Sequence, residues 1–513
     1  MLVKTFGSAI QGIIATTVTV EVAVEQGINF FLVGLPDNAV KESHQRISSA
    51  LNAYGYKIPG KKIVINMAPA DIKKEGSAYD LTLAVGILAS SEQISNPDRL
   101  KEYLIMGELS LDGSVRPIKG ALPIAMQAKQ EGFKGFILPK ANAKEAAIVQ
   151  GLEVLGVDNI LEVINFFNGT QAIEREIVDI EKEFEKGLEN YDLDFADVKG
   201  QENIKRAMEV AAAGSHNVLL IGAPGSGKTM LAKRLPGILP PLTLEESLET
   251  TKIHSVAGKM GLRSSLISVR PFRSPHHTIS DIALVGGGAY PQPGEISLAH
   301  NGVLFLDELP EFKRSVLEVL RQPMEERVIT ISRTKQTTEY PASFMLVAAM
   351  NPCPCGYYNH PTIPCTCGAG AVNRYMSKIS GPLLDRIDIQ IEVVPVPFKE
   401  LSDQRTGEKS EVIRQRVIAA RKIQKERFKD IDTVHCNAQM TPKLMKEFCQ
   451  ISNQSMNLIK SAVSKLGLSA RAYDRILKVS RTIADLEGTA DIETRHIAEA
   501  INYRSLDRET WGR

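Results

Sequence analysis

The stretch Gly222-Ala-Pro-Gly-Ser-Gly-Lys228-Thr229 decides the fold of this chain. It follows a short apolar strand pattern and precedes a helical pattern, so it matches GxxxxGK(S/T) in the strand–loop–helix context that the motif requires. Backbone N–H groups of such a loop surround phosphate oxygens, and the start of the helix adds partial positive charge. We expect Lys228 to neutralise the β- and γ-phosphates and Thr229 to ligate Mg²⁺. The predicted nucleotide site consists of Gly222, Ala223, Pro224, Gly225, Ser226, Gly227, Lys228 and Thr229.

Two further strand patterns end in polar residues that suit the same chemistry. Val303–Leu306 is followed by Asp307 and Glu308, and Phe344–Met350 is followed by Asn351. Polar residues at the carboxyl ends of parallel strands meet at one edge of a sheet. A parallel strand beside the phosphate loop would place Asp307 near Mg²⁺. Glu308 would then polarise the attacking water as general base, and Asn351 would orient that water or contact the γ-phosphate.

Composition is that of a soluble globular protein. Of 513 residues, 43% are hydrophobic and 24% are charged, which argues against a disordered chain or a small disulfide scaffold. Lys plus Arg number 61 and Asp plus Glu 60, a net charge of +1, so any nucleic-acid site must be a local patch. No apolar run approaches the ~20 residues that span a bilayer, and the N-terminal apolar stretch fails as a signal peptide. We therefore expect a cytoplasmic protein without a membrane partner.

The secondary-structure pattern divides the chain into four segments. The expected segments are residues 1–168, 169–199, 200–396 and 397–513. The first alternates strand and helix patterns, including a period-2 strand at Thr17–Glu25 and a hairpin turn at Asp112-Gly113. The second is an acidic linker or a solvated helix, because Gln171–Gly200 holds ten acidic residues against four basic ones. The third is a second α/β block, and the fourth looks helical throughout.

Four of the six cysteines are clustered in the sequence. Cys353-Pro-Cys355 and Cys365-Thr-Cys367 form two CxC pairs separated by nine residues. Four thiolates so close together suit tetrahedral Zn²⁺, which could fix an otherwise loosely packed segment. CxC pairs are less typical of zinc sites than CxxC pairs, so reduced free cysteines and a redox pair stay open as alternatives. His360 lies between the pairs and could replace one thiol.

Two arginines complete a series of motifs that resembles the AAA+ ATPases. Gly381-Pro-Leu-Leu-Asp385-Arg386-Ile-Asp388 precedes a strand pattern, and Leu468-Ser-Ala-Arg471-Ala begins a helix pattern. Together with Phe272-Arg-Ser-Pro-His-His277-Thr-Ile-Ser280 and the segment from Pro293 to Pro310, they make the chain similar along nearly its whole length to the Mg-chelatase-like ComM/YifB family. This resemblance implies an α/β fold with an N-terminal Lon-protease-like α+β domain, a central AAA+ P-loop domain with a parallel sheet, and a C-terminal helical lid.

The resemblance also implies roles for individual residues. The matched positions are Walker A (residues 222–229), Walker B (Asp307 and Glu308), sensor 1 (Asn351), the arginine finger (Arg386) and sensor 2 (Arg471). ATP and Mg²⁺ are therefore the expected ligands. The finger serves the neighbouring subunit's ATP, and sensor 2 lies on the lid over the same nucleotide. An arginine supplied in trans makes hydrolysis depend on assembly, and the family implies a homo-oligomeric, hexameric ring.

Two details of the resemblance leave alternatives open. Residues 281–294 lie where this clade inserts a hairpin, so they form either a pore-facing loop with Tyr290 as its aromatic residue or an ordinary connection. His276 and His277 either structure their own loop or face the nucleotide or substrate.

The N-terminal segment resembles the Lon protease domain at Ala70–Ala78 and Gly107–Ile118. Lon-type peptidases use a Ser–Lys dyad. Alignment puts Ala78 at the nucleophile position and Leu122 at the lysine position, so we expect no peptidase activity. The domain would instead bind a protein partner or DNA, or shape the ring.

What ATP hydrolysis would drive is a separate question. The ComM-like resemblance implies DNA remodelling, as a helicase or branch-migration motor in natural transformation. A ring with basic residues facing its channel would track a phosphate backbone without sequence preference. The alternatives are a protein-remodelling motor and a Mg-chelatase-type ATPase subunit that acts on a protein partner.

Overall fold

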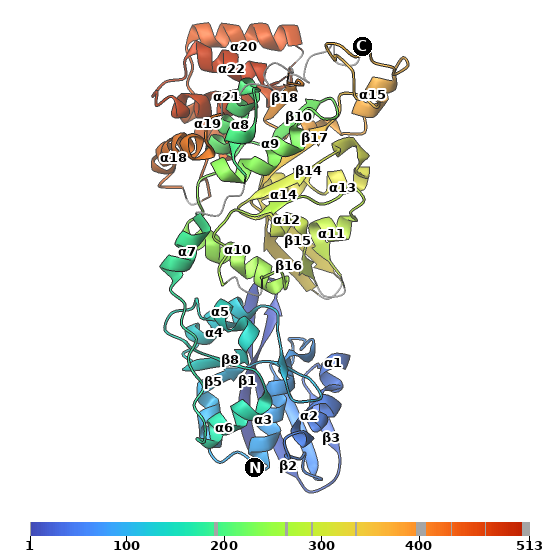
Figure 1. Ribbon diagram of the computed structural model, residues 1–513, viewed down its shortest axis with the longest axis vertical. Helices are drawn as coiled ribbons and strands as arrows, with labels where there is room; N and C mark the ends of the chain where they lie inside the picture. Colours follow the sequence, from blue (N-terminus) through green and yellow to red (C-terminus); the bar gives the residue numbers. More distant parts are fainter. Residues whose placement is uncertain are drawn as a thin grey trace. The chain divides into compact units, whose positions relative to one another are not determined.

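The computed structural model describes residues 2–188, 193–261, 265–288, 291–333, 336–396, 407–431, 433–466 and 468–504. The chain divides into two compact units (Figure 1). The first comprises Met1–Gly187 and Leu244–Ser268, and the second comprises Leu188–Thr243 and Val269–Arg513. Residues 244–268 lie inside the expected ATPase block of the sequence, yet they pack with the N-terminal unit.

A mixed seven-stranded sheet forms the first unit. Its strand order is β3 (Phe30–Val33), β4 (Lys62–Ala68), β2 (Ile14–Glu25), β1 (Leu2–Gln11), β5 (Tyr103–Ile105), β8 (Gly135–Pro139) and β9 (Glu153–Val157). β2 pairs antiparallel with β1 and β4, whereas β5, β8 and β9 continue the sheet in parallel. Val18, Val20 and Val22 are fully buried on one face of β2, which confirms the predicted period-2 strand. The turn at Asp112-Gly113 joins the antiparallel pair β6 (Glu108–Leu109) and β7 (Val115–Arg116), as predicted.

Helices complete the core of the first unit. The main ones are α2 (Ser43–Asn52), α3 (Asp80–Ser90), α4 (Ala121–Gln130), α5 (Lys140–Ala146), α6 (Ile160–Asn168) and α10 (Leu244–Val256). Every residue of α3 is buried. α10 belongs here because its Ser255 carbonyl accepts a hydrogen bond from Gly120 N–H at 3.1 Å and its Ser255 hydroxyl donates to Glu145. A buried carboxylate thus joins two segments that are far apart in the sequence.

The second unit contains a five-stranded, wholly parallel sheet, as expected for a P-loop domain. Its order is β11 (Phe272–Arg273), β14 (Val303–Leu306), β17 (Met345–Met350), β10 (Val218–Gly222) and β18 (Ile389–Val393). All residues of β10, β14 and β17 are buried, because helices cover parallel sheets on both faces. The core begins before the expected start at residue 200, since Phe195 and Val198 are fully buried in it.

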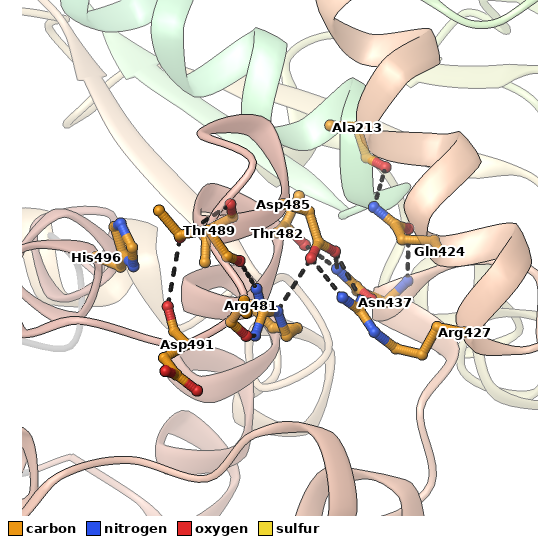
Figure 2. A network of polar contacts seen from close by, with 12 residues as sticks. Ala213, Gln424, Arg427, Asn437, Arg481, Thr482, Asp485, Thr489, Asp491 and His496 are labelled. Atoms are coloured by element: carbon orange, nitrogen blue, oxygen red, sulfur yellow. Dashed lines mark hydrogen bonds and ion pairs between the residues drawn. The ribbon is translucent and has the colours of Figure 1, made fainter.

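Helices from the C-terminal part pack on this unit through a buried polar network (Figure 2). They are α18 (Ser410–Arg427), α19 (Pro442–Phe448), α20 (Asn453–Leu466), α21 (Ala470–Leu486) and α22 (Thr494–Asn502). Asp485 on α21 accepts two bonds from Arg427, at 2.7 and 2.5 Å, and one from Asn437 at 2.8 Å. Gln424 donates to the Ala213 carbonyl at 3.0 Å and so ties α18 to α8 (Glu202–Gly214).

Two hairpins extend from the second unit. β12 (Gly286–Gly287) pairs with β13 (Gln292–Pro293) within the expected insertion, and Tyr290 lies outside the described residues. β15 (Val328–Arg333) pairs with β16 (Gln336–Pro341), a hairpin that the sequence analysis did not predict. The Tyr340 hydroxyl donates to the Pro291 carbonyl at 2.7 Å, so the two hairpins are joined. Among the described residues, no helix has the length and apolarity needed to cross a membrane.

Candidate functional site

The phosphate loop lies between β10 and α9 (Lys228–Arg234), at the carboxyl edge of the parallel sheet. Gly227 has φ +94°, a conformation that favours glycine, and it turns the chain into the helix. The Lys228 Nζ donates to the carbonyls of Gly222 at 2.7 Å and Ala223 at 3.0 Å. Burial lowers the pKa of Lys228, and the nearby charges of Asp307 and Glu308 oppose that shift. A buried lysine held only by neutral oxygens is well placed to exchange them for phosphate oxygens.

The carboxylate of Asp307 reaches the loop from β14. Its Oδ2 accepts a hydrogen bond from the Thr229 hydroxyl at 2.7 Å. In the sheet β17 lies between β14 and β10, yet the parallel strand β14 still brings Asp307 to the phosphate loop, where the sequence analysis expected it. Asp307 spans the intervening strand because it extends past the end of β14 at the sheet edge. A hydroxyl and a carboxylate oxygen in contact are ligands that Mg²⁺ prefers.

Glu308 turns away from Asp307 and meets a histidine. It adopts φ +53°, in the left-handed region, which directs its side chain out of the line of the strand. His277 Nδ1 lies 3.3 Å from Glu308 Oε2, and its ring is 4.1 Å from the His276 ring, centroid to centroid. The sequence analysis left the role of the two histidines open. The structure places His277 on Glu308 and bonds His276 to Thr278 in its own loop at 2.9 Å.

Asn351 follows β17 and completes the site. Its Oδ1 accepts from Lys228 Nζ at 3.3 Å. A cavity of about 390 Å³ opens here. It is lined by Pro224, Gly225, Ser226, Gly227, Lys228, Thr229, Met230, Asp307, Glu308, Met350 and Asn351. The structure therefore brings together the loop, both acidic residues and the asparagine that the sequence analysis singled out.

The two candidate arginines lie elsewhere. Of the described residues, those that line this cavity include neither Arg386 nor Arg471. Arg386 is largely buried and forms an ion pair with Glu325 at 2.5 Å, while Arg471 is exposed and pairs with Asp385 at 3.0 Å. Because Asp385 precedes Arg386 in the chain, the two arginines share one region of the second unit.

The four clustered cysteines meet in space. The sulfur atoms of Cys353, Cys355, Cys365 and Cys367 all lie within 4.8 Å of one another, and such a group could hold a metal ion. Ligand sulfurs ~2.3 Å from a tetrahedral Zn²⁺ are about 3.8 Å apart, close to the 3.3–3.7 Å between the sulfurs of Cys353, Cys355 and Cys365. Burial raises the pKa of Cys355, but hydrogen bonds from backbone N–H groups and neighbouring thiols lower it to about 5. The same thiol contacts raise the pKa of Cys365 and Cys367, so the four cysteines hold their protons as one group. His360 is not part of this group; its Nδ1 accepts from Ile363 N–H at 3.0 Å.

Sequence reasoning missed one residue at the phosphate loop. The Gln201 amide donates to the Ser226 carbonyl at 2.9 Å and to the Val394 carbonyl at 3.2 Å, so it ties the loop to the chain after β18. No motif surrounds Gln201, and only the fold brings it to the loop.

The Lon-like positions lie in the first unit. Ala78 is half-buried, and the side chain of Leu122 is fully buried beside Ile148 and Leu266. Ser77 donates a short hydrogen bond to Glu108.

Comparison with known proteins covers nearly the whole chain. Residues 194–401 match the family described as magnesium chelatase, subunit ChlI; residues 20–142 and 407–504 match the models for subunit ChlI of Mg-chelatase and for its C-terminal region. Competence protein ComM of Haemophilus influenzae is 44% identical over 98% of this chain and 97% of its own. YifB of Escherichia coli is 44% identical over 97% of this chain and 96% of its own. Lon protease 2 of Bacillus subtilis is 32% identical over 24% of this chain and 22% of its own.

Proposed function

The chain belongs to the Mg-chelatase-like ComM/YifB family of AAA+ proteins, and on that premise we propose that it is an ATP-hydrolysing ring motor that remodels DNA. One observation carries the ATPase part of this proposal: Lys228, the Thr229–Asp307 pair and Asn351 converge on one cavity at the sheet edge. ATP would bind with its phosphates in this cavity.

The residues of the cavity divide the chemistry of hydrolysis between them. Thr229 and Asp307 would hold Mg²⁺, which would supply positive charge to offset that of the phosphates. Lys228 exchanges its two carbonyl bonds for phosphate oxygens. Glu308 accepts the proton of the attacking water, and Asn351 orients that water. His277 positions the Glu308 carboxylate, which it already contacts.

We assign Arg386 and Arg471 to the ATP of a neighbouring subunit in a homo-oligomeric ring, taken as a hexamer. Both lie outside the cavity of their own chain, and both adjoin Asp385. Arg386 would leave Glu325 when a neighbour's γ-phosphate offers it a stronger partner, since bidentate arginine–phosphate contacts are strong. Hydrolysis would then require assembly.

The DNA part of the proposal draws on a relative and on the hairpins. A relative that matches almost the whole chain is named a competence protein. In the sequence, Arg333 ends β15 and Lys335, outside the described residues, precedes β16; the β15–β16 hairpin is joined to β12–β13. Basic residues on hairpins of a ring would contact a phosphate backbone.

The decisive experiment is the steady-state ATPase rate with single-stranded, duplex and four-way-junction DNA at two salt concentrations. We expect strong stimulation that is greatest with the junction and falls at higher salt, because phosphate contacts release counterions. A basal rate that no DNA changes would contradict the DNA proposal and favour a protein substrate, to be sought by pull-down.

We also propose that the four-cysteine group holds one structural Zn²⁺ per chain. The four sulfurs and their separations fit a tetrahedral thiolate site. Zn²⁺ bound there would cross-link Cys353 and Cys355 to Cys365 and Cys367. It would not supply redox chemistry.

A further inference from the structure

The segment that carries the four cysteines leads directly out of the nucleotide cavity. β17 ends at Met350, Asn351 contacts Lys228, and the buried Cys353 follows two residues later. The first metal ligand and the residue that touches the phosphate-loop lysine are therefore separated by a single proline, Pro352. A shift of the four-cysteine group would therefore move Asn351 as well.

The same segment also packs against the phosphate loop itself. Gly356, directly after Cys355, has φ +86° and lies against Pro224. A Cβ atom on Gly356 would be 2.6 Å from Pro224 Cδ, closer than real Cβ contacts come. The close approach and the positive φ both require glycine at this position. The cysteine segment is thus one wall of the loop that holds the phosphates.

A second cavity, of about 530 Å³, continues this wall. Glu308 and Asn351 line both cavities, and Pro354 of the cysteine segment lines this one together with Arg374 and Lys378. The lining of this cavity therefore extends from Glu308, the proposed general base, to Pro354 within the four-cysteine group.

Little of the segment from Asn351 to Gly370 is buried. Between Asn351 and Gly370 the chain forms neither helix nor strand, and only Pro352, Cys353 and Gly356 are buried. A segment of this length with so little buried surface gains too little from packing to offset its conformational entropy. A metal that cross-links its two ends would supply the missing constraint.

We propose that Zn²⁺ on Cys353, Cys355, Cys365 and Cys367 fixes the wall of the ATP site, so that nucleotide affinity depends on metal occupancy. This inference rests on the proposed zinc and ATP sites. Without the metal, Gly356 would leave Pro224 and Asn351 would lose its fixed position beside Lys228. Binding of the phosphates would then also have to order the cysteine segment, and this entropic cost would weaken nucleotide affinity.

The test measures zinc content and the Kd for fluorescently labelled ADP with Mg²⁺ on the full-length chain. Cys365→Ser/Cys367→Ser removes two ligands far from Pro224 in the sequence, and Cys436→Ala/Cys449→Ala removes the two cysteines outside the group. We expect the first variant to lack zinc and to bind nucleotide at least about tenfold more weakly. The second should match the wild type in both measurements.

Two further measurements test the proposal even if the cysteine variant folds poorly. Gly356→Ala should keep its zinc and still bind nucleotide more weakly, because its Cβ displaces Pro224. Removing zinc from the wild type with a zinc-selective chelator should weaken binding, and adding Zn²⁺ back should restore it.

Each negative result has its own meaning. Wild-type affinity in zinc-free protein, or in Gly356→Ala, overturns the coupling. Wild-type protein that binds nucleotide but neither contains nor takes up zinc overturns the metal site. Zinc-loaded wild type that binds no nucleotide overturns the ATPase proposal instead.

Discussion

At the scale of single residues, a substitution of Glu308 can separate ATP hydrolysis from ATP binding. Glu308→Gln keeps the shape of the side chain and removes its ability to accept a proton. We expect unchanged ATP affinity and a turnover lower by about 10²–10⁴-fold, the usual contribution of a general base. Equilibrium binding and single-turnover hydrolysis measure the two separately. Turnover at the wild-type rate would exclude Glu308 as the base.

His277→Ala provides the matched comparison for that variant. His277 touches the Glu308 carboxylate and is absent from the cavity lining given above. A residue that positions the base lowers kcat with little effect on KM, and we expect a loss of about tenfold, or ~1.4 kcal/mol. Equal losses in the two variants would mean that His277 itself takes part in proton transfer.

At the scale of elements, Asp485 holds the C-terminal helices together. Its carboxylate is fully buried and accepts bonds from Arg427, Arg481 and Asn437 (Figure 2). Asp485→Ala removes the carboxylate partner of two largely buried guanidinium groups, so we expect a loss of about 3–5 kcal/mol in the free energy of unfolding. Asp491→Ala, at an exposed position in the same region, should cost less than about 0.5 kcal/mol. Urea unfolding followed by circular dichroism compares them, and equal midpoints would contradict the role of Asp485.

The buried His216, between α8 and β10 and in contact with α21, should make stability depend on pH. His216 is fully buried, its Nε2 lies 2.8 Å from the Thr482 hydroxyl and its Nδ1 lies 3.5 Å from Asp388. Burial lowers the pKa of His216. Its other charged neighbours keep their charge: Arg475 and His216 hold the pKa of Asp388 well below its usual range against the effect of burial, and burial lowers the pKa of Lys478 only to about 8.

The direction of this pH dependence follows from His216 alone. Below the ordinary histidine pKa of ~6.5, the unfolded chain binds a proton at this position and the folded chain does not. Stability is therefore fully present above that pKa and falls on acidification, by up to ~1.4 kcal/mol per pH unit, until the lowered folded pKa is reached. Comparing unfolding midpoints between about pH 7.5 and about pH 5.5 tests this. His216→Gln should show a smaller loss over that range, and an identical loss would exclude His216 as the cause.

Elements defined by local patterns were predictable, whereas those defined by distant contacts were not. The phosphate loop, β14 with its two carboxylates and the turn at Asp112-Gly113 each carry their signal within a few residues. β1 (Leu2–Gln11) was missed because Gly7, Ser8 and Gln11 interrupt its apolar pattern, and its pairing with β2 compensates. Likewise, only tertiary contacts place α10 with the first unit and Gly356 against Pro224.

At the scale of the whole molecule, the proposed ring would make a complete catalytic site a property of two subunits, because Arg386 would act on a neighbour's ATP. Within one chain this arginine is engaged by Glu325 and is absent from the cavity lining. A chain that must borrow its arginine from a neighbour can be inactivated in two independent ways, at its own base or at its neighbour's finger. Each defect affects a different interface.

This independence predicts complementation between two inactive variants. Arg386→Ala retains Glu308, and Glu308→Gln retains Arg386, so a mixed ring contains interfaces at which a working base meets a working finger. With random mixing of equal amounts, roughly a quarter of the interfaces are complete, and activity should reappear up to about that fraction of the wild-type rate. The measurement is ATPase rate against mixing ratio, with ring assembly of each variant checked by mass photometry. If both variants assemble and exchange subunits yet the mixture stays inactive at every ratio, Arg386 does not act in trans and must serve its own chain after breaking from Glu325.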